Sequence, residues 1–181
     1  MPSIAEALVL TVSLTVSAAG PEKPDLPRAI VEEGLARAGC TVPASRARIV
    51  GTEVLGPQLQ IVEMTCAAGP HGIRSVLFGV PHGLAGQARL LPLEGWDRGR
   101  IRPIYSVPSP GYDRKTRTLS ATDSRRESGD CGVIQEWKWT GWHFRLLHAW
   151  SKDRCDGLPF EWDTREGWQV FPAPAAGPGH G

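Results

Sequence analysis

The clearest helical pattern in the chain lies just before residue 40. Between residues 27 and 38, apolar side chains recur every three to four positions and so share one face of a helix: Ile30, Val31, Leu35 and Ala38. Pro27 suits the first turn of a helix, and Gly39 is a natural stop. The pattern therefore predicts one N-terminal helix over residues 27–38.

After the helix the pattern changes to short apolar runs separated by turn residues, which is typical of β-strands. The first four runs cover residues 48–55, 58–66, 73–80 and 87–93, with Gly56-Pro57, Gly69-Pro70 and His82-Gly83 between them. Further runs cover residues 115–122, 131–139, 142–150 and 168–171. Because the strands follow one another without helices, we expect antiparallel pairing.

These elements predict an α+β fold that is mainly antiparallel β, with the helix packed on short-stranded sheets. We expect two halves, a helix and β half over residues 20–94 and a tryptophan-rich β half over residues 95–171. The Gly- and Pro-rich segment Gly95–Pro110 is expected to connect them, and residues 172–181 are expected to form a disordered tail.

The first 19 residues resemble a secretory signal peptide. Ile4 to Ala19 is an apolar stretch that ends in small residues, although no Lys or Arg precedes it. It is shorter than the ~20 residues of a membrane-spanning helix, and a buried amphipathic helix is the alternative. We therefore predict a periplasmic or secreted bacterial protein with no membrane span in the mature chain.

The four cysteines support this interpretation because they are even in number and widely spaced. No C-x-x-C pair is present, so a zinc site is not predicted. Two disulfides allow three connectivities, and we favour the sequential pairs, Cys40 with Cys66 and Cys131 with Cys155, each of which closes a loop of about 25 residues. Four reduced, buried thiols in a cytosolic protein are the alternative.

Tryptophan dominates the aromatic residues, with 7 copies, and four of them lie between Trp137 and Trp150. A two-residue turn at Thr140-Gly141 would pair Trp139 with Trp142 and Trp137 with Phe144 on one aromatic face, whereas a three-residue turn would shift the register by one. We expect this face to be mostly core, with Trp142 exposed at the turn. The alternative is a ligand-binding platform built from Trp137, Trp139 and Trp142.

Charge and the remaining polar residues narrow the function classes. A net charge of +1 argues against an electrostatic nucleic-acid binder. Arg98, Arg100 and Arg102 alternate along an extended segment and could bind an anionic group.

Asp130 is expected to organise a turn, as are Gly129, Gly132 and Gly141. The histidines lack ligand spacing and no nucleophile elbow is present, so no metal, cofactor or catalytic residue is predicted.

The residues from Tyr112 to Phe171 resemble the C-terminal part of a bacterial exported family of unknown function, DUF1176. The shared features are Tyr112-Asp113, Thr118-Leu119-Ser120, Gly129-Asp130-Cys131-Gly132, Trp137-x-Trp139-x-Gly141, Phe144-x-Leu146, Cys155-x-Gly157 and Trp168. The resemblance implies an exported protein with a Cys131–Cys155 bridge and implies no activity. Arg126-Glu127-Ser128, Thr140 and Asp156 depart from the family pattern.

We therefore expect a monomer that acts by binding rather than by catalysis. The leading hypothesis is a protein-interaction or inhibitor-like module whose partner is another protein of the cell envelope. A module that binds a saccharide or small ligand through Trp142 is the second. A hydrolase that uses Asp130, Asp153 or Asp156 is the third.

Overall fold

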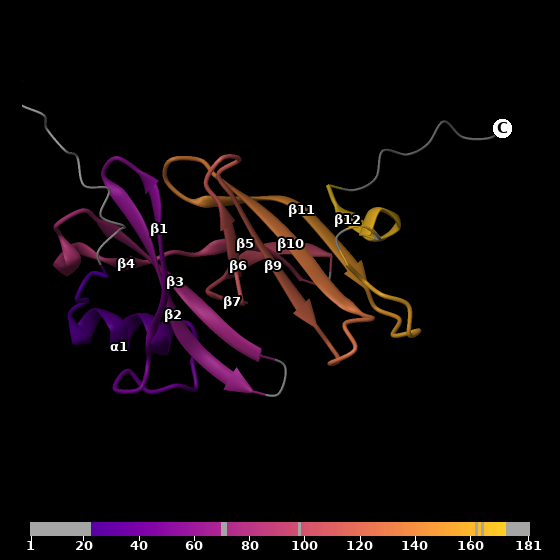
Figure 1. The fold of residues 1–181 in the computed structure, drawn as a ribbon, viewed down its shortest axis with the longest axis horizontal. Helices are drawn as coiled ribbons and strands as arrows, with labels where there is room; N and C mark the ends of the chain where they lie inside the picture. Colours follow the sequence, from indigo (N-terminus) through magenta and orange to yellow (C-terminus); the bar gives the residue numbers. More distant parts are fainter. Residues whose placement is uncertain (1–22, 70–71, 98, 162, 164, 173–181) are drawn as a thin grey trace, which may run out of the picture.

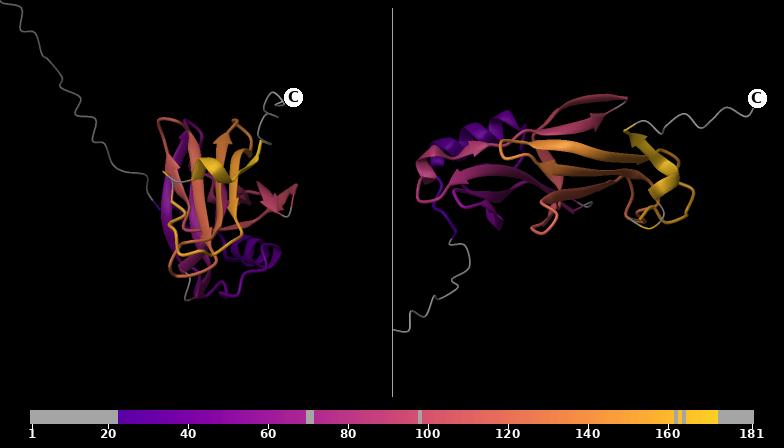
Figure 2. Two further views of the ribbon diagram at one scale, coloured as in Figure 1. Left: turned by 90° about the vertical axis from the view of Figure 1, so that its right-hand side faces the viewer. Right: turned by 90° about the horizontal axis from the view of Figure 1, so that it is seen from above.

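A computed structural model describes residues 23–69, 72–97, 99–161, 163 and 165–172 of this chain. The expected leader and residues 173–181 of the expected tail lie outside this part. Within it, one helix and two β-sheets form an elongated molecule, with the helix at one end and the C-terminal segment at the other (Figures 1 and 2). The predicted β-rich, mainly antiparallel fold with one helix is confirmed.

The first sheet has the strand order β1-β2-β3-β4, and a short strand from later in the chain, β7, also pairs with β3. Its strands are β1 (Ile49–Gly56), β2 (Leu59–Gly69), β3 (Gly72–Pro81), β4 (Arg89–Leu90) and β7 (Ser106–Pro108). The turn between β1 and β2 falls at the predicted Gly56-Pro57 position.

The second sheet has the order β6-β5-β11-β10-β9-β8, with β12 paired to β11. Its strands are β5 (Leu93–Asp97), β6 (Arg100–Ile104), β8 (Gly111–Asp113), β9 (Thr118–Ser124), β10 (Gly132–Trp139), β11 (Phe144–Lys152) and β12 (Gln169–Phe171). The pairing of β5 with β11 is parallel. Gly95–Pro110, expected as a connection, instead carries the end of β5 together with β6 and β7, because both sheets use this segment to extend their edges.

The helix α1 (Arg28–Arg37) covers one face of the first sheet. Its buried Val31 and Leu35 pack on alternate residues of β2 and β3, which are Val62, Met64, Val76, Phe78 and Val80. Gly34 permits the close approach, because a Cβ built there would lie 2.5 Å from Cζ of Phe78. No helix of the described residues is long and apolar enough to cross a membrane.

The other face of the first sheet packs on the second sheet and forms the main core. The first sheet contributes Leu55, Ile61, Leu77 and Val107, and the second contributes Leu93, Leu119, Ala121, Trp137, Trp139, Phe144, Leu146 and Ala149. Strands β2 and β3 are therefore covered on both faces, and each has buried apolar residues on both.

Two disulfides fasten the outer parts of this stack. Cys40, just beyond α1, bonds to Cys66 on β2, and the amides of Thr41 and Val42 donate to the Cys66 carbonyl. Cys131 bonds to Cys155 across the open end of the β10–β11 hairpin. The sequential pairing of the four cysteines is confirmed, and no cysteine is free.

Candidate binding surfaces

The β10–β11 hairpin does not have the register that the sequence suggested. Trp139 pairs with Phe144 rather than with Trp142, and a bulge follows, so that Glu136 faces His148. The favoured two-residue hairpin turns, types I′ and II′, need positive φ at the first central position, which disfavours Thr140 there. The loop lengthens to residues 140–143 instead, with positive φ at Gly141 alone among them.

Between the turn and the bulge the shift from the expected pairing is two residues, and an even shift keeps the side chains of that stretch on their expected faces. Trp137 and Trp139 consequently lie on the same face as Phe144, as expected, and this face is core. Trp137 is fully buried and donates its indole N–H to the Glu94 carbonyl at 2.6 Å. Both tryptophans are buried, so of the three candidate platform residues only Trp142 presents its ring at the surface.

Trp142 has the opposite environment, with 80% of its surface exposed at the tip of the hairpin. The turn beneath it is held by hydrogen bonds from the Thr140 amide and hydroxyl to the His143 carbonyl, at 3.1 and 3.0 Å. Glu94 holds the C-terminal side of the turn and the start of β11. Its Oε2 accepts the Leu146 amide at 3.0 Å, and its Oε1 lies 3.9 Å from His143 Nε2. We call residues 140–143 the Trp142 turn.

A polar groove of about 430 Å³ lies along strands β8, β9 and β10. The end of β10, just before the Trp142 turn, is bonded to the segment between β8 and β9. The Trp139 amide donates to the Arg117 carbonyl at 3.0 Å, and Lys138 Nζ donates to the Thr116 carbonyl. The groove is lined by hydroxyl and carboxylate groups, from Asp113, Thr116, Thr118, Ser120 and Glu136, together with Gly111 and Tyr112. No sequence motif marks this groove, although the alternate polar residues of the β9 run indicate an exposed face.

Asp113 fixes the shape of the groove at its β8 end. Its carboxylate accepts the Lys115 amide at 2.8 Å and the Thr116 hydroxyl at 2.9 Å, and these bonds hold the pKa of Asp113 below its usual range. Asp113 is therefore a carboxylate that organises its turn.

The predicted arginine site is only partly described. Arg98 lies outside the described residues. Arg100 and Arg102 are exposed on the edge strand β6, and Arg102 forms an ion pair with Asp97. The positive charge of Arg102 is therefore already balanced within the strand pair.

Asp130 is buried and bound to its own loop neighbours. Its Oδ1 accepts the Ser128 hydroxyl at 2.6 Å and its Oδ2 accepts the Gly157 amide at 2.8 Å. The bond from Ser128, followed by that from Gly157, lowers the pKa of Asp130. The flanking Gly129 and Gly132 both have positive φ, and a Cβ at Gly132 would lie 2.2 Å from the Asp123 carbonyl oxygen.

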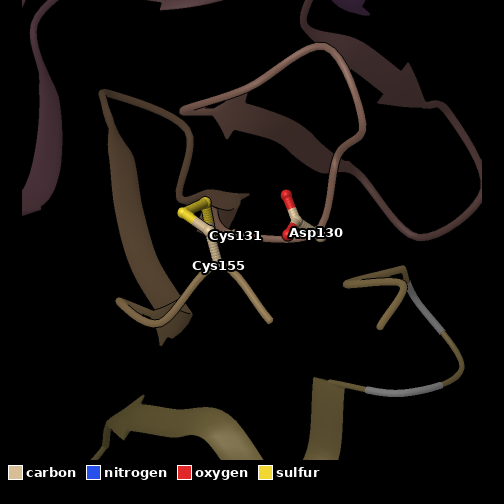
Figure 3. Close-up of side chains that lie close together, drawn as sticks. All are labelled: Asp130, Cys131 and Cys155. Carbon is tan, nitrogen blue, oxygen red and sulfur yellow. A yellow bond between two sulfur atoms is a disulfide. The ribbon is translucent and has the colours of Figure 1, made fainter. Parts of the chain in front are cut away.

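One group of metal-ligand atom types occurs among the described residues, formed by Asp130, Cys131 and Cys155 within 4.8 Å of one another (Figure 3). The two sulfur atoms are joined to each other in the disulfide. Thiolates, not disulfide sulfurs, are metal ligands. This group is therefore structural, because its disulfide holds the two ends of the β10–β11 hairpin together.

The two other acidic residues of the hydrolase hypothesis also have structural partners. Asp153 pairs with Arg125 at 2.7 Å, and Asp156 accepts Nζ of the buried Lys152 at 2.6 Å. The contact with Lys152 lowers the pKa of Asp156. A general acid needs a raised pKa, so these environments weigh against acid catalysis by Asp130 or Asp156.

Comparison with known proteins identifies a family and nothing more specific. A family model described as "Protein of unknown function (DUF1176)" matches residues 17–170. The chain belongs to this family. The match extends the resemblance from the C-terminal third to nearly the whole described fold, the helix and both sheets included. No curated protein and no solved structure matches this DUF1176 member.

Proposed function

We propose that this DUF1176 protein is an exported, non-catalytic interaction module that binds another envelope protein through the Trp142 turn. One observation carries the proposal: a tryptophan with 80% of its surface exposed stands on a turn fixed by hydrogen bonds. Tryptophan is among the residues most enriched in the energetic centres of protein interfaces. A turn that is ordered before binding also loses little conformational entropy on binding.

The two disulfides support the exported location in this proposal. Disulfides persist in oxidising compartments and are rare in the cytosol. Both bridges join residues that are close in the sequence, and each fastens an outer element of the fold. They suit a small protein that must keep its shape outside the cell.

The experiment uses a photo-crosslinking amino acid in place of Trp142 in the exporting bacterium. We expect one specific crosslinked partner, and we expect Trp142→Ala to weaken its co-purification by about thirtyfold, the loss typical of an interface hot spot. Leu158 provides the matched control, because it is 65% exposed and apolar but belongs to the C-terminal segment. Equal crosslinking from both positions, or none from position 142, would contradict the proposal.

Saccharide binding is the second candidate function, and the polar groove favours it. Hydroxyl and carboxylate groups line the groove and suit the hydroxyls of sugars, and the exposed Trp142 suits their apolar ring faces. The same Trp142→Ala variant serves as the control in a fluorescence titration with a glycan panel. A tryptophan signal that no glycan changes would remove this candidate and leave the protein partner.

A further inference from the structure

A second and smaller pocket, of about 200 Å³, lies between the two sheets. Strands β1, β2 and β3 form one wall, and β8 and β9 form the other. Its apolar surface comes from the buried Ile61, Leu77 and Leu119. It shares no residue with the Trp142 turn, and its volume suits a short aliphatic chain rather than a drug-sized ligand.

Glu63 supplies a half-buried carboxylate to this pocket from β2. Its Oε1 accepts the hydroxyl of the fully buried Ser75 at 2.6 Å, which fixes the carboxylate in place. Its Oε2 accepts no hydrogen bond from the described residues. Glu63 pairs in register with Gly51 on β1, and a Cβ at that glycine would lie 3.3 Å from Oε2. The missing side chain at Gly51 therefore leaves this oxygen uncovered.

Within the part of the chain that the structure describes, no ion pair joins Glu63 to a cation. Glu53 also lines the pocket, but it is paired with Arg114 at 2.6 Å. Tyr112 faces the pocket from β8, and burial raises its pKa while the nearby Arg117 opposes that rise. Burial raises the pKa of Glu63 as well, which means that its carboxylate has lost hydration that a ligand could replace.

We propose that this pocket binds an aliphatic primary ammonium group, with the ammonium on Glu63 Oε2 and its methylenes against Ile61, Leu77 and Leu119. A guanidinium prefers a bidentate contact with both carboxylate oxygens, and Ser75 already holds one of them, whereas an ammonium is a compact point charge. A hard metal cation needs about six oxygen ligands, and one uncovered oxygen does not supply them. An anion would meet two carboxylates.

The test is a titration of the full protein with n-butylammonium at neutral pH, followed by backbone amide shifts in NMR spectra. We expect saturable shifts at Gly51 and Glu63 and a dissociation constant on the order of millimolar, because the ligand has few atoms. Glu63→Gln removes the charge and should weaken binding at least about tenfold. Glu136→Gln, in the polar groove, is the matched control and should leave binding unchanged.

Gly51→Ala gives an independent variant that keeps the carboxylate and covers Oε2. It should also weaken n-butylammonium, even if Glu63→Gln does not fold. The neutral n-butanol tests the ammonium itself and should not bind measurably. Unchanged binding in both variants, or equal binding of n-butanol, would overturn the proposal.

The ammonium can come from a lysine side chain of a protein or from a free alkylamine. Nα-acetyl-lysine N-methylamide separates these sources. Binding comparable to n-butylammonium identifies a lysine side chain, and binding of n-butylammonium alone identifies a small free amine. The Trp142→Ala variant should retain amine binding, so failure of this proposal and failure of the proposed function give different results.

Discussion

Gly34 lies where α1 packs directly on Phe78 of the first sheet. A methyl group there would lie 2.5 Å from Cζ of Phe78, whose side chain is fully buried under the helix. In an open helix alanine is favoured over glycine by about 1 kcal/mol. Here overpacking should outweigh that preference, so we expect Gly34→Ala to lower the free energy of unfolding by about 1–3 kcal/mol. Urea denaturation of the purified variant measures the change.

Gly86 provides the control for this substitution. It lies in the short 3-10 helix η1 (Ala85–Gln87), and no heavy atom lies within 4 Å of the position a Cβ would take. Gly86→Ala should therefore be nearly neutral or slightly stabilising. The double variant Gly34→Ala with Phe78→Leu should recover part of the loss, because the shorter side chain leaves room for the methyl group. A Gly34→Ala protein as stable as the wild type would refute the close contact.

Among the elements, the β9–β10 loop and the C-terminal segment are joined by Asp130. Ser128 and Gly157 donate to its carboxylate, and the Phe160 amide donates to the Gly129 carbonyl at 3.3 Å. Phe160 in turn packs on Ile134 and Trp150, on the face of the second sheet away from the core. The segment after β11 therefore covers this face through one buried carboxylate and one aromatic ring.

The lowered pKa of Asp130 makes this junction sensitive to acid. A carboxyl group whose folded pKa lies below its usual 3.8 adds stability that is complete above that value and is lost as the pH falls through the folded pKa. We expect Asp130→Asn to destabilise the protein at pH 7 and the difference from wild type to shrink below pH ~4. Urea midpoints at several pH values give the comparison. The exposed Asp163→Asn is the control, and a difference for Asp130→Asn that stays constant with pH would contradict the assignment.

Many of the helix and strand positions could be predicted from the sequence. A helix or strand that buries one face repeats its apolar residues at a fixed spacing, and this spacing is visible in the sequence. α1 lies within the predicted range, and the first three strands match their runs to within a few residues. The hairpin register could not be predicted, since it depends on turn length and on a bulge rather than on periodicity. The 95–110 segment was also misassigned, because β6 and β7 are short edge strands whose prolines resemble a loop.

The candidate sites were predictable to different degrees. Trp142 could be found because it lies beside Gly141, which places it in a turn. Glu63 could not, since it is one of several polar residues in a largely apolar strand, and only its contacts with Ser75, Gly51 and the facing sheet set it apart. A pocket between two sheets is lined by residues that are far apart in the chain, so no short sequence motif reveals it.

For the whole molecule, the sheets and the disulfides have separate roles. The core between the two sheets is formed by apolar side chains, and neither disulfide joins one sheet to the other. One bridge ties the chain just after α1 to β2, and the other closes the β10–β11 hairpin. With sequence separations of 26 and 24 residues, loop-closure entropy gives each about 3–4 kcal/mol. That amount is a large share of the stability of an ordinary domain, so the fold depends on an environment where the bridges form.

This dependence makes the compartment testable from the mass of the protein. We expect the chain, expressed in a bacterium with its N-terminal residues intact, to be recovered from the periplasm or medium without residues 1–19. Thiol alkylation without reduction should add no mass, and alkylation after reduction should add four labels, one for each cysteine. Expression without the first 19 residues is the control, and it should leave the protein in the reducing cytosol with free thiols and lower stability. A full-length chain with four free thiols in its native host would contradict both the exported location and an envelope partner for the Trp142 turn.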